Sequence, residues 1–369
     1  MKIKRIEAIA INVPMVKPVR MSFEEVRAAN NVLVRLEAAD GVVGWGEAGS
    51  APTMTGETLE GMVAAVRHLA PRLEGMDADD IAAVMERAER YLYGNSAAKS
   101  AIEMALHDAS GKALGKPACE LLGGKRRNRV PLLRLVGTGK GTAADVEDAL
   151  KHKAAGYVAF KVKVGVGDPL EDAERTRKVC EALGNGGLLV CADANQGWNP
   201  EQAVAYVRAV ADTTLAFFEQ PVPAADLEGM ARVARASCIT IGADEGLHSM
   251  EDIRRHHEAG AARGGSLKTI KLGGMKPVCD AARLFEELGW KVNLACKMAE
   301  SSIAAAAMMH VAAVVPAIDW GVSLTHPYLT DDLVRQPVAI SSGHAELPPG
   351  TGTGIEVDEA KVRRYAREV

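Results

Sequence analysis

From about residue 130 to residue 322, short apolar segments alternate with segments of helical periodicity. The segments that we expect to be strands lie at 130–136, 157–164, 188–193, 215–219, 238–244, 267–272, 290–295 and 317–322. Helical patterns fill the gaps, for example at 170–183, 200–211, 275–288 and 301–314. Short apolar strands separated by helices are typical of a parallel sheet that is buried on both faces. Eight such units predict an α/β fold, and a β/α barrel rather than a doubly wound sheet.

The first 125 residues have a different pattern. Residues 2–12 alternate as a strand, and 31–39 and 42–48 read as two strands joined at Asp40-Gly41, a strong hairpin signal. Helical patterns follow at 56–70, 78–91 and 96–115. We therefore expect an α+β unit at 1–125, a barrel at 126–325 and a Pro- and Gly-rich C-terminal segment at 326–369.

Charge and cysteine usage exclude several classes of function. The formal net charge is −4, which gives no electrostatic footprint for nucleic acid or an anionic membrane. The six cysteines form no CxxC pair and lie mostly in apolar patterns, so we expect them to be reduced. The N-terminus lacks the apolar core of a signal peptide, and no apolar run reaches about 18 residues. These features predict a cytoplasmic protein.

Three carboxylates stand at the ends of consecutive predicted barrel strands. Asp193, Glu219 and Asp244 are spaced by 26 and 25 residues, one βα unit each. Active sites of such barrels lie at the carboxyl ends of the strands. Clustered carboxylates repel one another, and a divalent cation relieves that repulsion. An all-oxygen set suits Mg²⁺, or Mn²⁺, rather than Zn²⁺. The alternative is that each acid caps the helix that follows it.

Lysines supply a second group of candidates. Lys161 and Lys163 are two residues apart, so they share one face of the second strand. Lys271 is expected to end the sixth strand, which lies opposite the second in an eight-stranded barrel. Lysines held in the barrel mouth near a divalent cation are expected to have depressed pKa values and to act as bases, with Lys161 as an electrostatic support. The alternative is that these lysines extend from the strand ends to solvent.

The segments that carry these residues resemble the enolase superfamily, in its mandelate racemase/muconate lactonizing enzyme family and muconate lactonizing enzyme subgroup. They are, in order, NSAAKSAIEMALHDASGKALGKPACELLGG, KVKVG, DANQGW, FFEQPV, GADEG, IKLGG, KMAESSI and TGTGIEVDE. The resemblance covers nearly the whole chain. It implies a modified TIM barrel, (β/α)7β, with an N-terminal α+β capping domain and a C-terminal segment that returns to the cap.

The resemblance also implies roles for individual residues. Asp193, Glu219 and Asp244 would bind Mg²⁺, and Lys163 and Lys271 would be the two acid/base groups. The reaction would remove the proton next to a carboxylate of a small-molecule substrate and give an enediolate, which Mg²⁺ stabilises. We further expect a homo-oligomer, from dimer to octamer.

Residues outside this core are expected to surround the substrate. Asn195 and Glu245 would lie near the metal, and Glu300 would hold the substrate carboxylate or a lysine. Loops at 14–30 and 49–56 would close over the barrel mouth.

Strand 7 and strand 8 carry departures from relatives. No His follows strand 7, which argues against a base of the mandelate racemase type. Asp319 is followed by Trp320, without the Asp-x-Asp that dipeptide epimerases use to hold an ammonium. Lys297 precedes Met298, where relatives usually carry a small or apolar residue; Lys297 is either a second carboxylate contact or exposed.

Met298, Asp319 and Trp320 are therefore candidate substrate contacts. Phe23, Met21 and Met54 are expected either in the pocket or in the core.

Several reactions remain open at this point. The leading hypothesis is racemisation, epimerisation or dehydration of an amino-acid-derived carboxylate, such as a proline derivative. The alternatives are a muconate or chloromuconate cycloisomerase, and an N-acylamino acid racemase or o-succinylbenzoate synthase. Outside this chemistry we also consider a non-catalytic metal-binding homologue and a Schiff-base aldolase.

Overall fold

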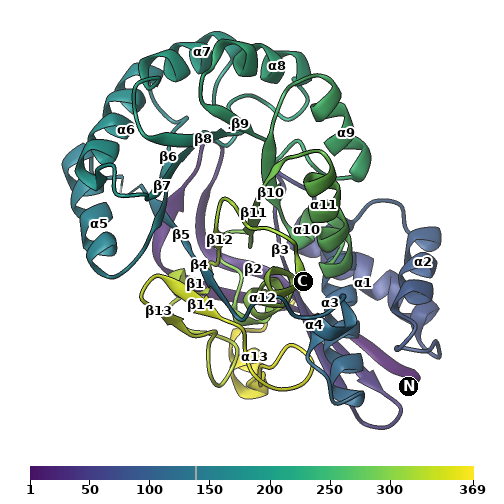
Figure 1. Ribbon diagram of the computed structural model, residues 1–369. Coiled ribbons are helices and arrows are strands. Elements are labelled where there is room, and N and C mark those ends of the chain that lie inside the picture. Colours follow the sequence, from purple (N-terminus) through teal and green to yellow (C-terminus); the bar gives the residue numbers. More distant parts are fainter. Residues whose placement is uncertain (138) are drawn as a thin grey trace.

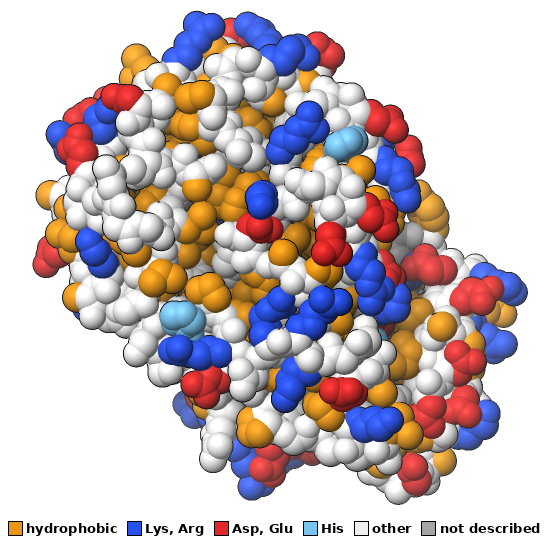
Figure 2. All heavy atoms as spheres, viewed as in Figure 1, with side chains coloured by type: hydrophobic (Ala, Val, Ile, Leu, Met, Phe, Trp, Pro, Cys, Tyr) orange, Lys and Arg blue, Asp and Glu red, His pale blue; other side chains and the backbone are white. Residues whose placement is uncertain are grey.

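The computed structural model describes residues 1–137 and 139–369. A ring of parallel strands surrounded by helices lies beside a smaller unit of antiparallel strands and helices (Figure 1). Within the described residues, no helix is both long and apolar enough to cross a membrane. All six cysteines are free. Acidic and basic side chains are interspersed on the face in Figure 2.

The smaller unit is the cap. Strands β1 (Ile3–Arg20), β2 (Glu25–Ala38) and β3 (Val43–Gly49) form an antiparallel sheet in that order. Helices α1 (Leu59–Leu73), α2 (Ile81–Tyr91), α3 (Ser96–Ala113) and α4 (Ala118–Leu121) follow. β1 runs eight residues beyond the predicted strand, so the turn into β2 falls at residues 21–24.

Helix α3 packs very closely on β3. A Cβ atom at Gly44 would lie 2.1 Å from the carbonyl oxygen of Ala105, and one at Gly46 would lie 1.9 Å from that of Ala101. The glycines of the segment VGWGEA therefore set how near the helix comes to the sheet.

The barrel contains two groups of parallel strands. The first is β5 (Leu133–Val136), β6 (Ala159–Lys163), β7 (Leu189–Asp193), β8 (Leu215–Glu219) and β9 (Thr240–Gly242). The second is β10 (Gly264–Leu267), β11 (Lys291–Ala295) and β12 (Val322–Ser323). Parallel bridges from Ala243 to Gly265 and from Leu132 to Val322 join the groups into a closed ring.

Helices connect these strands around the outside of the ring (Figure 1). They are α5 (Thr142–Ala154), α6 (Pro169–Leu183), α7 (Pro200–Ala209), α8 (Leu227–Ala236), α9 (Met250–Glu258), α10 (Thr269–Leu272), α11 (Met275–Glu287) and α12 (Ser302–Val314). Side-chain caps begin several of them; Asp168, for example, accepts hydrogen bonds from the backbone N–H groups of Leu170 and Glu171.

The prediction of the sixth barrel strand at 267–272 was wrong. The strand is Gly264–Leu267, and Thr269–Leu272 is the short helix α10. Its glycines have a packing reason: a Cβ at Gly264 would lie 2.4 Å from the Trp320 ring, and one at Gly265 would lie 2.5 Å from the carbonyl oxygen of Ala243. A strand made of such residues lacks the β-branched pattern by which strands are recognised.

The predicted strand 130–136 is divided. β4 (Arg129–Pro131) pairs with β14 (His344–Glu346), and only β5 joins the barrel. The C-terminal segment also contains η1 (His326–Tyr328), β13 (Ile340–Ser341) and α13 (Glu359–Tyr365). It bridges to β1 at two places, Ile11 to Ala366 and Met15 to Leu329, so it contacts both barrel and cap.

Buried carboxylates attach the cap to the barrel. Glu47 of β3 accepts hydrogen bonds from the backbone N–H groups of Ser301 and Ala304, at the start of α12. Glu103 of α3 accepts them from Met275 and Lys276, at the start of α11. Negative charge is favoured at helix N-termini, so these contacts fix the cap relative to the barrel mouth.

Candidate active site

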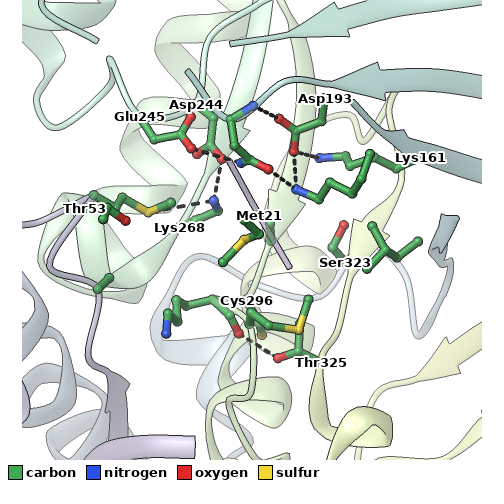
Figure 3. A pocket seen from close by; sticks show the side chains of 18 of the residues that line it. Met21, Thr53, Lys161, Asp193, Asp244, Glu245, Lys268, Cys296, Ser323 and Thr325 are labelled. Carbon is green, nitrogen blue, oxygen red and sulfur yellow. Dashed lines mark hydrogen bonds and ion pairs between the residues drawn. The ribbon is translucent and has the colours of Figure 1, made fainter. Parts of the chain in front are cut away.

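A pocket lies between the carboxyl ends of the barrel strands and the cap. The cap contributes the turn at residues 21–24 together with Ala51, Thr53 and Met54. The predicted covering segments, 14–30 and 49–56, thus include the cap residues that line it. Figure 3 shows two walls. Asp193, Asp244, Glu245 and Lys268 gather on one, and Cys296 and Thr325 lie on the other.

The three predicted carboxylates come together at this rim. Asp193 and Glu219 are the last residues of β7 and β8 and stand in register, and Asp244 follows β9 by two residues. Each is 1% exposed. Burial, together with the charges of Asp193 and Asp244, raises the pKa of Glu219. Burial also opposes ionisation of Asp193 and Asp244, but neighbouring lysines hold both pKa values below the usual range.

Each of these carboxylates pairs with a lysine. Lys161 of β6 donates to Glu219. Lys163 Nζ lies 2.6 Å from Asp193 Oδ2 and 2.5 Å from Asn195 Oδ1. Lys268, directly after β10, donates to Asp244. Lys163 and Lys268 follow the second and sixth strands, which lie opposite each other in the ring, and both line the pocket.

The sequence placed Lys271 at the end of the sixth strand, and that placement is wrong. Lys271 lies in α10, one turn beyond the strand, and is 1% exposed. Its Nζ donates to the carbonyl oxygen of Ser266 at 2.8 Å, to Asp244 Oδ1 at 2.7 Å and to the Asp244 carbonyl oxygen. Lys268, which the sequence analysis missed, takes the strand-end position in the pocket.

Residue spacing gave no signal that separates Lys268 from Lys271. Asp193, Glu219 and Asp244 are separated by 26 and 25 residues. Lys268 lies 24 residues beyond Asp244 and Lys271 lies 27 beyond it, so the two lysines depart equally from that spacing.

The protein's own groups raise rather than depress the pKa of Lys161, whereas the prediction concerned lysines beside a bound cation. Burial of Lys161 lowers the pKa, but the charges of Glu219 and Asp193 outweigh that effect and hold the pKa above its usual value. Lys268 shows the same balance, with Asp244 as the main partner. Burial does lower the pKa of Lys271.

A further carboxyl group lies beside the three. Asn195 Nδ2 donates to Glu245 Oε1 at 3.0 Å, and Glu245 Oε2 is buried with no hydrogen-bond partner among the described residues. Burial and the charges of Asp244 and Asp193 raise the pKa of Glu245 to about 7. Asn195 and Glu245 thus lie next to the three predicted metal-binding carboxylates, as we predicted from the sequence.

These donors fit a divalent cation such as Mg²⁺. Asp193, Glu219 and Asp244 supply buried oxygens, and the unpartnered oxygen of Glu245 is a site for a further donor or cation-bound water. As the described side chains stand, no three His, Cys, Asp or Glu groups converge to hold a metal ion, because lysines take the carboxylate oxygens. Metal binding therefore requires the carboxylates to exchange lysine contacts for the cation.

The opposite wall follows β11 and β12. Lys297, Met298 and Thr325 line the pocket there. Glu300 does not hold a lysine ammonium: its carboxylate accepts from the backbone N–H groups of Gly49, at 3.1 Å, and Lys297, at 2.8 Å. It thereby ties the cap loop to the loop after β11. Burial, with the charge of Glu47, raises the pKa of Glu300 to about 7.

Two predicted contacts lie elsewhere. Asp319 is at the amino end of β12, where it pairs with Lys291 at 2.9 Å and accepts from the backbone N–H of Val292. Trp320 stacks on Phe217 inside the barrel, with ring centroids 3.8 Å apart. Both residues precede β12, so they lie at the end of the strand that is away from the active-site rim. The residues from the other end of this strand that line the pocket are Ser323, Leu324 and Thr325.

For three cap residues the sequence left the pocket and the core as alternatives, and the structure places them at the pocket. Met21, Phe23 and Met54 line the pocket, and Phe23 is 65% exposed.

Comparisons with known proteins agree with this arrangement. The family described as "Enolase C-terminal domain-like" matches residues 144–361. The family described as "Mandelate racemase / muconate lactonizing enzyme, N-terminal domain" matches residues 5–123. A chloromuconate cycloisomerase of Cupriavidus necator is 33% identical over 372 residues, which span 100% of both chains.

Two solved structures are similar over almost their full length. The muconate lactonizing enzyme of Pseudomonas fluorescens complexed with muconolactone has a TM-score of 0.95 and 31% identity and covers 99% of each chain. The N-succinyl Arg/Lys racemase of Bacillus cereus has a TM-score of 0.94 and 30% identity, over 100% of this chain and 99% of that one.

Proposed function

The chain belongs to the mandelate racemase/muconate lactonizing enzyme family of the enolase superfamily and is an isomerase or lyase of that superfamily. From this premise we propose that it is a Mg²⁺-dependent cycloisomerase of a muconate-type dicarboxylate. The observation that carries the proposal is the pair Lys163 and Lys268, which line the pocket beside three buried carboxylates and come from strands that lie opposite each other in the barrel.

Asp193, Glu219 and Asp244 would hold Mg²⁺, with Mn²⁺ as a substitute. The bound cation would supply Lewis-acid stabilisation of the negative charge that develops on the substrate carboxylate. It would also compete with the lysines for the carboxylates. A lysine released from its carboxylate is free to turn toward the substrate.

The lysines would handle the proton. In a cycloisomerisation, an oxygen of one carboxylate adds to a double-bond carbon of the conjugated diene and closes the lactone ring. The electron pair of that double bond moves to the carbon next to the other carboxylate. Lys163 or Lys268, as an ammonium, then gives its proton to that carbon. Lys161, paired with Glu219, keeps a positive charge near the site.

The comparisons favour this reaction over the proline-type substrate that the sequence analysis put first. The similar chain with 33% identity over its full length is a chloromuconate cycloisomerase. The pocket also places a fourth lysine, Lys297, on its far wall. A substrate with a free ammonium would be repelled there, whereas a second carboxylate would be attracted.

Racemisation of an N-acylated amino acid is the second candidate. The likeness to an N-succinyl Arg/Lys racemase supports it, as do two pocket lysines that come from opposite strands of the barrel. In that reaction one lysine removes the proton next to the carboxylate, and the other returns a proton on the opposite face.

The experiment is an assay with Mg²⁺ and cis,cis-muconate or a chloromuconate, followed by the loss of the diene absorbance. In D₂O, the lactone should carry one deuterium next to the free carboxylate. The matched controls are Lys163→Ala and an exposed lysine variant, Lys178→Ala. No turnover of any muconate, together with deuterium exchange into N-succinyl amino acids, would replace the first proposal by the second.

A further inference from the structure

Hydrogen bonds and packing hold Lys297 in place on the pocket wall opposite the carboxylates. Its backbone N–H donates to Glu300 at 2.8 Å, and its carbonyl oxygen accepts from Thr325 Oγ1 at 2.7 Å. A Cβ atom added to Gly49 would lie 3.0 Å from Lys297 Cδ, so the stem of the side chain packs against the cap there. The residue is 9% exposed and lines the pocket.

The ammonium of Lys297 differs from those of the other pocket lysines. Lys161, Lys163 and Lys268 each pair with a carboxylate. Within residues 1–137 and 139–369, no hydrogen bond or ion pair reaches Lys297 Nζ. Lys297 Nζ is not one of the fully buried polar atoms that lack a partner, so it opens into the pocket, where it is available to a carboxylate. Burial lowers the pKa of Lys297, although the charges of Glu24 and Glu300 oppose this.

The strand order shows which part of a substrate would reach this lysine. The metal-binding carboxylates follow barrel strands three to five, and Lys163 and Lys268 follow strands two and six. A substrate carboxylate at the cation therefore points its neighbouring carbon between these two lysines. The rest of the molecule extends toward strands seven and eight, where Lys297 and Thr325 lie.

We infer that Lys297 binds a second carboxylate at the far end of the substrate and so makes this site selective for dicarboxylates. The inference deepens the proposed function and rests on it for the placement of the first carboxylate. In a cycloisomerisation the second carboxylate is the one that closes the ring, so Lys297 would also orient the attacking oxygen.

Glu24 is the competing partner for Lys297. It belongs to the cap turn, lines the same pocket and is close enough to act on the charge of Lys297, although no ion pair joins the two side chains. If their pairing were the role of Lys297, the lysine would close the cap over any substrate, and its loss would weaken all ligands equally.

The test uses two ligands of six carbons that do not react. Adipate has a carboxylate at each end, and hexanoate has one. Calorimetric titration of the Mg²⁺-loaded protein should show that adipate binds more tightly. Replacing Lys297 by Met should weaken adipate about 10-fold to about 100-fold, the effect expected of a lost charge-assisted hydrogen bond, and leave hexanoate nearly unchanged. Lys297→Arg should keep most of the preference, and the surface variant Lys178→Met should keep all of it.

The outcomes separate this inference from the proposed reaction. An equal loss of both ligands in Lys297→Met, or no loss of either, would overturn the inference. A wild-type protein that prefers adipate through Lys297 but does not turn over muconate would support the inference and overturn the cycloisomerase proposal. Glu24→Gln should not remove the preference for adipate; if it does, the cap pairing takes the place of the inference.

Discussion

The two walls of the pocket are built on different principles. On the wall that follows β6 to β10, each lysine that lines the pocket is paired with a carboxylate. On the wall that follows β11 and β12, Lys297 stands among Met298, Leu324 and Thr325, and none of the residues that the structure describes pairs with its ammonium. Under the proposed function, the first wall, which we call the chemical wall, would move a proton beside a carboxylate. The second, which we call the recognition wall, would select the substrate that carries that carboxylate.

The walls also differ in how their residues are held. Asp193 and Glu219 are the last residues of neighbouring strands, so the parallel ladder fixes their separation. Lys297 and Glu300 lie in a loop, and the cap holds them through Gly49. The positions of Asp193 and Glu219 on the chemical wall are therefore set by the barrel strands. The positions of Lys297 and Glu300 on the recognition wall depend on where the cap packs against the barrel.

The largest effect should come from the chemical wall, at Lys268. Lys268→Ala should lower kcat by at least about 1,000-fold with little change in the thermal unfolding midpoint, because it removes a proton-transfer group from the pocket. Lys271→Ala is the matched variant. It removes three buried hydrogen bonds made by Nζ, so it should chiefly lower the unfolding midpoint.

Activity assays and calorimetry on both variants check this assignment. A well-folded but inactive Lys271→Ala protein beside an active Lys268→Ala protein would return the role to the residue that the sequence first suggested.

The second effect concerns the metal. EDTA should abolish activity, and added Mg²⁺ should restore it, because the three carboxylates would repel one another and the substrate without a cation. Glu245→Gln should weaken Mg²⁺ about 10-fold to 100-fold, since its buried oxygen lies next to the binding carboxylates. Activity measured against Mg²⁺ concentration gives this affinity. Full activity in the presence of EDTA would show that the reaction does not need a metal ion.

The sequence predicted much of the chemical wall and little of the other. The sequence predicted the positions of Asp193, Glu219 and Lys163 because the carboxyl ends of the strands in a parallel barrel lie at the same rim. The apolar segments of the sequence show where those strands end. The sixth strand was predicted at the wrong residues because it contains two glycines, which pack against Trp320 and the backbone of Ala243. That packing is a property of the folded barrel and leaves no propensity signal.

The contacts on the recognition wall are long-range. Lys297 and Gly49 approach each other across nearly 250 residues of sequence, and Thr325 meets Lys297 across two elements. Asp319 and Trp320 were candidate substrate contacts because dipeptide epimerases of the subgroup that the sequence resembles hold an ammonium with an Asp-x-Asp at strand 8. The strand begins after them, so they lie at its other end.

The third effect is a pH dependence on the recognition side. Burial raises the pKa of Glu300 to about 7, above the roughly 4.3 of an unfolded glutamate, so the folded protein binds a proton that the unfolded chain has released. Its contribution to stability is complete below about pH 4 and is lost as the pH rises through about 7.

Replacing Glu300 by Gln should remove this loss. Between about pH 4 and above pH 7 the wild type should lose on the order of 3–4 kcal/mol relative to the variant. In acid the variant should be the less stable protein, because the Gln Nε2 cannot accept one of the two backbone N–H groups that Glu300 accepts. Unfolding midpoints measured between about pH 5 and about pH 8 check the trend. Parallel curves for the two proteins would mean that Glu300 titrates normally and that the cap is held in another way.

The smallest effect should come from Asp319. Its partners, Lys291 and the backbone N–H of Val292, belong to the amino ends of the strands, and the pair with Lys291 is partly exposed. Asp319→Asn should therefore change kcat/KM by less than about twofold and stability by no more than about 1 kcal/mol. The matched variant is Thr325→Val, beyond the other end of β12, which removes the hydrogen bond to Lys297 and should raise KM more than it lowers kcat. If Asp319→Asn raised KM as much as Thr325→Val, residues at both ends of β12 would affect substrate binding. The recognition wall would then extend beyond the active-site rim.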